Sequence, residues 1–209
     1  MNICDLQTGD IILVSNYEKG WFNYFLDMIR YGTHSDYVHV GIIVKNPEFT
    51  ETPLTGTFFW ESSYEGTPDP QDGEVKLGVQ LTRIEDIIKN YNNAKFYVRK
   101  FNDYSSFTTE NLLKIHKVVY DKPYDLNPTD WVKALFQKNN TPQKTSSFWC
   151  SAFVGYVLTK LNILNENTDW TIMRPCDLAL DGENLKWSGS IKLLPNESKL
   201  ILYDNPSLN

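Results

Sequence analysis

The sequence contains few of the residues that build disulfide frameworks and metal sites. Among 209 residues there are only 3 cysteines and 3 histidines: Cys4, Cys150, Cys176, His34, His39 and His116. The cysteines are odd in number and far apart, so we expect no disulfide framework and a reducing compartment. None belongs to a Cys-x-x-Cys pair, and the histidines lack the paired spacing of zinc ligands. The sequence therefore predicts no metal site and no cofactor.

Positive charge and long apolar runs are also scarce. The chain has 20 Lys and Arg against 26 Asp and Glu, a net charge of -6. A nucleic-acid-binding protein needs a basic face to contact phosphates, so we expect no nucleic-acid partner. No apolar run reaches the roughly 18 residues of a membrane-spanning helix, which predicts no transmembrane segment. Residues 1–9 lack the features of a signal peptide, so we expect a cytoplasmic protein with at most peripheral membrane contact.

The rest of the composition is typical of a folded globular chain. It is 41% hydrophobic, 22% charged and 14% aromatic. No internal repeat, low-complexity tract or linker interrupts it. We therefore expect residues 1–209 to form a single domain.

Hydrophobic periodicity predicts a mixture of strands and helices, which indicates an α+β fold. The predicted strands are 10–14, 37–44, 58–63, 78–81, 95–101, 190–194 and 199–203. The predicted helices are 20–30, 82–91, 108–120, 127–136 and a late helix that begins near Cys150. A capping box at 82–85 and a threonine cap at 108 or 109 should start two of these helices.

The two faces of the strand predicted at 37–44 differ in their side chains. Alternation places Val38, Val40, Ile42 and Val44 on one face, and His39, Gly41 and Ile43 on the other. The glycine next to His39 would leave room for a helix to approach closely.

The late helix begins on a thiol. Val154, Val157 and Leu161 follow Cys150 at helical spacing and should pack inward. Ser146 or Ser147 could cap the first turn. A cysteine there lies in the field of the helix N-terminus, which favours the thiolate and suits a nucleophile. The alternative is that Cys150 is a small buried hydrophobic residue.

A nucleophilic cysteine needs a base, and that base usually needs a polar group to orient it. His39 lies on the face opposite the valines, and Glu61 lies among bulky aromatic residues in the next predicted strand. If the two strands pair, Glu61 could hold one imidazole nitrogen while the other faces Cys150.

Six short motifs together resemble the permuted papain-like cysteine hydrolases of the NlpC type. In chain order they are Gly9-Asp10-Ile11-Ile12-Leu13, His39-Val40-Gly41-Ile42, Trp60-Glu61-Ser62, Tyr124-Asp125, Cys150-Ser151-Ala152-Phe153-Val154 and Pro175-Cys176-Asp177-Leu178. The resemblance looks closest to the YiiX-like branch with its poxviral relatives, and more distant from lecithin:retinol acyltransferase. Papain-like enzymes have the cysteine before the histidine, whereas a circular permutation gives the reverse order found here. Residues 65–76 and the tail beyond 180 depart from the pattern.

The resemblance implies a circularly permuted papain-like fold, in which an antiparallel sheet or half-barrel packs against the cysteine-bearing helix and further helices. It implies Cys150 as the nucleophile, His39 as the general base and then acid, and Glu61 as the orienting residue. Backbone N–H groups near Ser151 would help to hold the oxyanion. Tyr124 and Tyr37 would line the site or support the oxyanion, or simply pack at its rim. Cys4 and Cys176 would be structural.

Three functions remain open from the sequence. The leading one is a cysteine hydrolase that cleaves an amide bond in a peptide or an amino-acid conjugate. The second is a lipid acyl-ester hydrolase or acyltransferase, with an acyl channel lined by aromatic residues that would fit a core equally well: Trp21, Phe22, Phe58, Phe59 and Trp60. The third is a binding module on the same fold without turnover.

Overall fold

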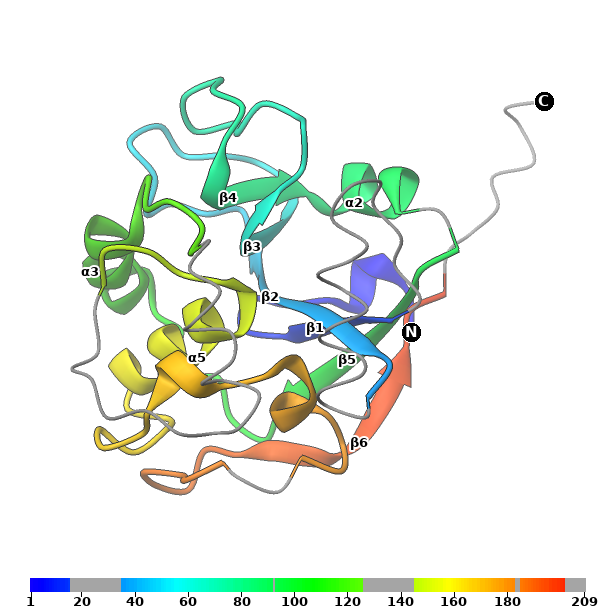
Figure 1. The fold of residues 1–209 in the computed structure, drawn as a ribbon, viewed down its shortest axis with the longest axis vertical. Helices are drawn as coiled ribbons and strands as arrows, with labels where there is room; N and C mark the ends of the chain where they lie inside the picture. The colour runs from blue at the N-terminus through cyan, green and yellow to red at the C-terminus, as the bar shows by residue number, and fades with distance from the viewer. Residues whose placement is uncertain (16–34, 92, 126–144, 183–184, 202–209) are drawn as a thin grey trace.

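A six-stranded sheet forms the centre of the molecule (Figure 1). The computed structural model describes residues 1–15, 35–91, 93–125, 145–182 and 185–201. The strand order is β4-β3-β2-β1-β5-β6, and each neighbouring pair is antiparallel. The strands are β1 (Ile11–Ser15), β2 (Tyr37–Lys45), β3 (Thr57–Tyr64), β4 (Leu77–Arg83), β5 (Lys95–Phe101) and β6 (Leu193–Lys199). With the helices below, this confirms the predicted α+β class.

The first five strands follow the predicted hydrophobic segments, whereas the end of the chain differs. Instead of two strands at 190–194 and 199–203, one strand spans Leu193–Lys199, and residues 202–203 lie outside the described part. This strand is mostly polar, and it forms because its backbone pairs with β5, for example Val98 with Ser198. Backbone pairing at a sheet edge leaves little trace in the side-chain pattern.

Three α-helices are described: α2 (Ile84–Asn90), α3 (Thr109–Val119) and α5 (Cys150–Lys160). Thr108 caps α3 as predicted, since its side chain accepts a hydrogen bond from the Asn111 backbone N–H. The capping box predicted for α2 is wrong, because Thr82 belongs to β4 and Arg83 is the cap residue. The helices predicted at 20–30 and 127–136 lie outside the described residues.

Two hydrophobic cores lie on opposite sides of the sheet. One includes residues of α3 and α5, such as Ile115 and Val154, and the other includes Ile84 and Ile87 of α2. Figure 1 accordingly shows α5 and α2 on opposite sides. Val154, Val157 and Leu161 of the predicted stripe are buried, but so is every residue from Cys150 to Leu158, so burial does not single out one inward face of α5.

The predicted alternation along β2 holds except at Val38. Val40, Ile42 and Val44 belong to the core under α5, but Val38 packs in the opposite core with Ile43. The pairing of β1 with β2 shifts register between Val14 and Ser15. The pairing skips Val38, and an extra residue of this kind disturbs the alternation of side chains between the two faces. The predicted face of Val38 is therefore wrong.

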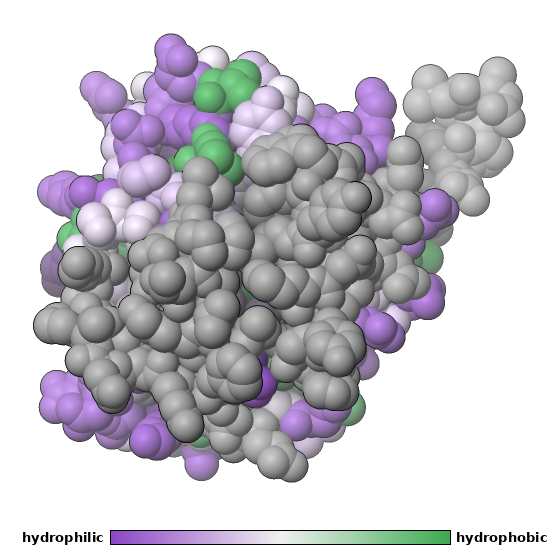
Figure 2. All heavy atoms as spheres, viewed as in Figure 1, coloured by the Kyte–Doolittle hydropathy of each residue, from purple (hydrophilic) through white to green (hydrophobic). Residues whose placement is uncertain are grey.

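The described surface carries only scattered apolar residues. Figure 2 shows hydrophobic residues in small separate groups among hydrophilic ones on one face. The exposed large apolar side chains are Tyr64, Val75, Val118, Tyr120, Leu180 and Ile201. None of the helices in the described ranges has both the length and the apolar character needed to cross a lipid bilayer.

Candidate active site

Helix α5 begins at Cys150, so the thiol occupies the first helical position. The cap residue is Trp149, and within the described residues no side chain caps this helix, so the predicted role of Ser146 or Ser147 is wrong. The reason lies in Phe148, whose backbone N–H donates to the Pro123 carbonyl and whose carbonyl accepts from the Asp125 N–H. These bonds hold the chain extended up to the helix and move the start of α5 beyond the reach of the serines.

The first turn of α5 is anchored to the chain near Met173. The Met173 carbonyl accepts hydrogen bonds from the Ser151 hydroxyl at 2.7 Å and from the Trp149 indole at 3.4 Å. Cys150 itself is only 3% exposed. The thiol is therefore held at a fixed helix N-terminus, where the backbone dipoles favour negative charge.

His39 and Glu61 lie where the pairing of β2 and β3 ends. The ladder between these strands runs from Lys45–Thr57 to Ile42–Trp60, whereas β3 goes on to pair with β4 as far as Tyr64. Beyond that end, the His39 Nε2 lies 2.5 Å from the Glu61 Oε2, with both side chains buried. This hydrogen bond continues the link between the strands through side chains.

The Cys150 side chain lies close enough to the His39 ring to raise the pKa of the imidazole. Burial alone would lower the pKa of His39, but the hydrogen bonds and charges of Cys150 and Glu61 outweigh it and raise that pKa to about 10. The histidine thus contacts both predicted partners. An imidazolium at neutral pH would stabilise a thiolate at Cys150.

The aromatic residues on the other side of His39 fix its ring. Phe59 meets the imidazole edge-on with ring centroids 5.7 Å apart, and Tyr91 lies at 6.5 Å. Gly41 makes room for this arrangement, since a Cβ there would lie 2.6 Å from the Phe59 ring. The prediction that Gly41 accommodates a helix is therefore wrong; the group that approaches it is the neighbouring strand's aromatic side chain.

The three additional site residues have different surroundings. Tyr124 is buried, and burial together with the charge of Cys150 raises its pKa, which puts its phenol in the field of the thiol. The Ser151 hydroxyl is used by Met173, as described above. The Tyr37 hydroxyl donates to Glu197 of β6 at 2.6 Å, which, with burial, raises the pKa of Tyr37. Tyr37 thus packs against the far edge of the sheet.

Ser62 is a site residue that the sequence did not single out. Its hydroxyl donates to the Phe148 carbonyl at 2.6 Å, two residues before Cys150. Successive strand residues point to opposite faces, so Glu61 reaches His39 while Ser62 reaches the start of α5. In the sequence, the alternation of side chains in a predicted strand could have indicated that Ser62 faces the opposite side of the sheet from Glu61.

The remaining cysteines and His116 have other partners or exposures. Cys4 is exposed and Cys176 is partly buried, and neither forms a disulfide. His116 faces Gln71, with its Nε2 2.6 Å from the amide oxygen. Within the part of the chain that the structure describes, no group of three or more His, Cys, Asp or Glu residues could hold a metal ion.

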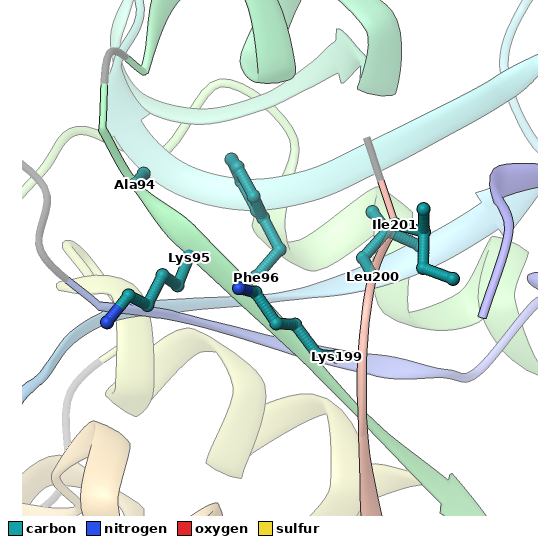
Figure 3. Close-up of a pocket in the computed structure, with 6 residues that line it drawn as sticks. All are labelled: Ala94, Lys95, Phe96, Lys199, Leu200 and Ile201. Atoms are coloured by element: carbon teal, nitrogen blue, oxygen red, sulfur yellow. The ribbon is translucent and has the colours of Figure 1, made fainter. Parts of the chain in front are cut away.

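A pocket of about 330 Å³ lies at the ends of β5 and β6 (Figure 3). It is lined by Ala94, Lys95, Phe96, Lys199, Leu200 and Ile201. Of the described residues that line it, none belongs to the candidate site. Phe58, Phe59 and Trp60, which the sequence offered as an acyl channel, are fully buried in the two cores, whereas Trp21 and Phe22 lie outside the described residues.

In comparisons with known proteins, no family model matches the chain and no curated protein matches it. The function must therefore be argued from the site itself.

Proposed function

We propose that this chain is a cysteine hydrolase of the circularly permuted papain-like type, which cleaves an amide bond in a peptide or an amino-acid conjugate. The observation that carries the proposal is the buried His39, which is hydrogen-bonded to Glu61 and lies close to the Cys150 side chain at the start of α5. A thiol at a helix start, a base within reach and a carboxylate on that base are the parts that thiol-dependent acyl transfer requires.

The first half of the reaction would form an acyl-enzyme. The Cys150 thiolate attacks the substrate carbonyl carbon, and the oxygen takes up the negative charge beside the first N–H groups of α5. The imidazolium of His39 then donates its proton to the amide nitrogen. The C–N bond breaks, the amine leaves, and a thioester remains on Cys150.

The second half would use His39 as a base. The neutral imidazole takes a proton from water while the water oxygen attacks the thioester carbonyl. The C–S bond breaks, which releases the carboxylic acid and restores the thiolate and the imidazolium. Glu61 holds the ring in orientation and stabilises its positive charge in both halves.

The residues assigned to the chemistry can be tested directly. Cys150→Ala and His39→Ala should each lower turnover by at least about 10³-fold, because each removes a member of a unit that acts together. The measurement is release of product from a panel of peptide amides and amino-acid conjugates, with circular dichroism to confirm folding. Cys176→Ala is the matched control and should keep its activity. Full activity in Cys150→Ala would exclude it as the nucleophile.

The same assay separates the alternatives. Faster turnover of lipid acyl esters than of amides would favour an acyl-ester hydrolase or acyltransferase with the same three residues. A binding module without turnover would show no elevated reactivity at Cys150. The rate of iodoacetamide reaction at Cys150, followed against pH, measures this property.

A further inference from the structure

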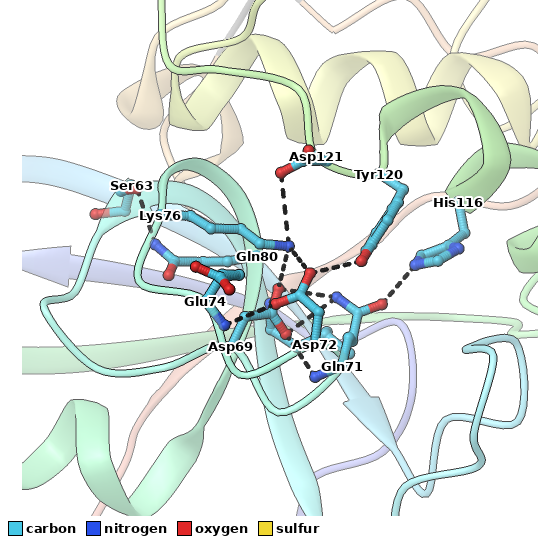
Figure 4. A network of polar contacts seen from close by, with 11 residues as sticks. Ser63, Asp69, Gln71, Asp72, Glu74, Lys76, Gln80, His116, Tyr120 and Asp121 are labelled. Atoms are coloured by element: carbon cyan, nitrogen blue, oxygen red, sulfur yellow. Dashed lines mark hydrogen bonds and ion pairs between the residues drawn. The ribbon is translucent and has the colours of Figure 1, made fainter.

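The loop 65–76, which departs from the resembled family, ends in an unusual lysine. Lys76 is buried, and its Nζ lies against Asp72, 3.3 Å from Asp69 and 3.7 Å from Asp121, with the Tyr120 ring at 4.5 Å (Figure 4). Asp69 and Asp72 belong to the loop, whereas Tyr120 and Asp121 follow α3. One ammonium group therefore joins two segments that are far apart in the sequence.

Two more contacts hold the same segments together. The Tyr120 hydroxyl donates to Asp72 at 2.5 Å, and the Gln71 amide oxygen lies 2.6 Å from the His116 ring. We call Gln71, Asp72, Lys76, His116, Tyr120 and Asp121 the lysine cluster. Because Lys76 is buried, its charge needs carboxylate partners, and the fully buried Asp69 beside it needs the lysine in turn, whereas Asp72 and Asp121 are more exposed.

The residues next to the lysine cluster lead to the start of α5. Directly after Lys76, the Leu77 carbonyl accepts from the Tyr124 N–H at 3.0 Å, and the Val79 N–H donates to the Lys122 carbonyl at 2.8 Å. Segment 122–125 thus lies along β4. The approach is close, since a Cβ at Gly78 would lie 2.2 Å from the Lys122 carbonyl oxygen.

Segment 122–125 in turn holds Phe148. The Phe148 N–H donates to the Pro123 carbonyl at 3.0 Å, and the Asp125 N–H donates to the Phe148 carbonyl at 3.2 Å. Cys150 follows two residues later. Lys76 is therefore linked to the start of α5 in two steps of backbone hydrogen bonds. The first joins β4 to segment 122–125, and the second joins that segment to Phe148.

We propose that the lysine cluster is a positioning device for Cys150, with Lys76 as its central positioning residue. By joining loop 65–76 to the end of α3, it fixes segment 122–125 against β4, and that segment fixes Phe148 and the helix start. This inference rests on the proposed function and adds to it a role for the loop. Small displacements of a reacting group lower the rate of the chemical step more than they weaken substrate binding.

The test compares Lys76→Met with the wild type in two measurements. We expect kcat to fall by about 10-fold with KM changed less than about 2-fold, as for a modest displacement of a reacting group. We also expect alkylation of Cys150 by iodoacetamide at neutral pH to slow by about 10-fold, since the thiolate loses its place beside His39. Mass spectrometry of the individual peptides gives the rates at Cys4 and Cys176 in the same sample.

Those two cysteines distinguish positioning from general loosening of the fold. If Lys76 positions Cys150, its loss slows alkylation of Cys150 alone. If its loss loosens the fold, alkylation of the partly buried Cys176 becomes faster. Lys114→Met is the matched control, because Lys114 is an exposed lysine of α3 that pairs with Glu110 of the same helix. It should leave every rate unchanged.

Defined outcomes would overturn the proposal. A folded Lys76→Met whose kcat and Cys150 alkylation rate equal those of the wild type would overturn it, as would faster alkylation at Cys176. If Lys76→Met does not fold, the same measurement is made on Tyr120→Phe. Slower alkylation of Cys150 in that variant supports the proposal, and an unchanged alkylation rate overturns it. An unreactive Cys150 in the wild type would instead reject the proposed function and this inference with it.

Discussion

At the scale of residues, two buried histidines have opposite electrostatic environments. Glu61 and Cys150 raise the pKa of His39 to about 10 against the effect of burial, whereas burial and the charge of Lys76 lower the pKa of His116 to about 4. At neutral pH, His39 should therefore be charged and His116 neutral. The same side chain serves as a candidate acid and base in one place and as a neutral packing residue in the other.

This difference predicts the protonation of each ring. We expect ¹⁵N-resolved NMR at pH about 7.5 to find both ring nitrogens of His39 protonated and only one of His116. On titration, His39 should lose its proton as the pH rises through about 10. His116 should gain one only as the pH falls toward about 4. His116→Gln assigns the signals, and a neutral His39 at pH about 7.5 would contradict the charged pair.

A second prediction concerns the carboxylate. Glu61→Gln keeps a hydrogen-bond acceptor beside His39 but removes the charge that stabilises the imidazolium. We expect kcat to fall by about 100-fold or more while measurable turnover remains, because an orienting group is less critical than the nucleophile. Steady-state kinetics beside Cys150→Ala provide the measurement. Equal activity in Glu61→Gln and the wild type would show that Glu61 has no orienting role.

At the scale of elements, the decisive feature is the end of the β2–β3 ladder. The strands pair up to Ile42–Trp60, and past that point His39 contacts Phe59 and Tyr91 of one core and Cys150 of the other. The candidate site therefore joins both sides of the sheet. Its geometry depends on how closely β2 and the Phe59 ring approach each other.

That dependence makes Gly41 sensitive to substitution. Gly41→Ala places a methyl group against the buried Phe59 ring, and overpacking of this kind costs about 1–3 kcal/mol of the free energy of unfolding. Displacement of Phe59 should also disturb His39 and lower kcat. Urea unfolding and steady-state kinetics measure the two effects. Gly189→Ala is the control, since nothing lies within 4 Å of its Cβ position; equal stability of both variants would refute the packing argument.

At the scale of the whole molecule, one sheet is shared by both cores. Residues of β1 alternate between them, with Ile11 and Leu13 in one and Ile12 and Val14 in the other. Neither core can lose its strands without exposing the other. Burial on both faces of the same strands couples the two cores in unfolding.

We therefore expect the chain to unfold as a single domain. Far-ultraviolet circular dichroism and tryptophan fluorescence should give one coincident transition in urea. Trp60, Trp149 and Trp170 are buried in the core under α5 and make fluorescence sensitive to that core, while circular dichroism reports the sheet and helices together. Two separated transitions would divide the chain into independent units.

The sequence by itself determined the local features of this protein. Apolar runs, alternation and helical spacing predicted β1 to β5 and helix α5, because burial favours those patterns in the chain. Cys150, His39 and Glu61 could be selected as candidates because few residues of these types occur in suitable positions.

Only the tertiary structure decided how these parts meet. Four features depend on backbone or side-chain partners distant in the sequence: the irregularity at Val38, the polar strand β6, the start of α5 after Phe148 and the contact of Tyr37 with Glu197. The lysine cluster is the clearest case, since the sequence marked loop 65–76 only as a departure from a pattern. Asp72, Lys76 and Tyr120 interact only because the fold brings them together. The burial that makes Lys76 need a partner is a property of the fold rather than of the local sequence.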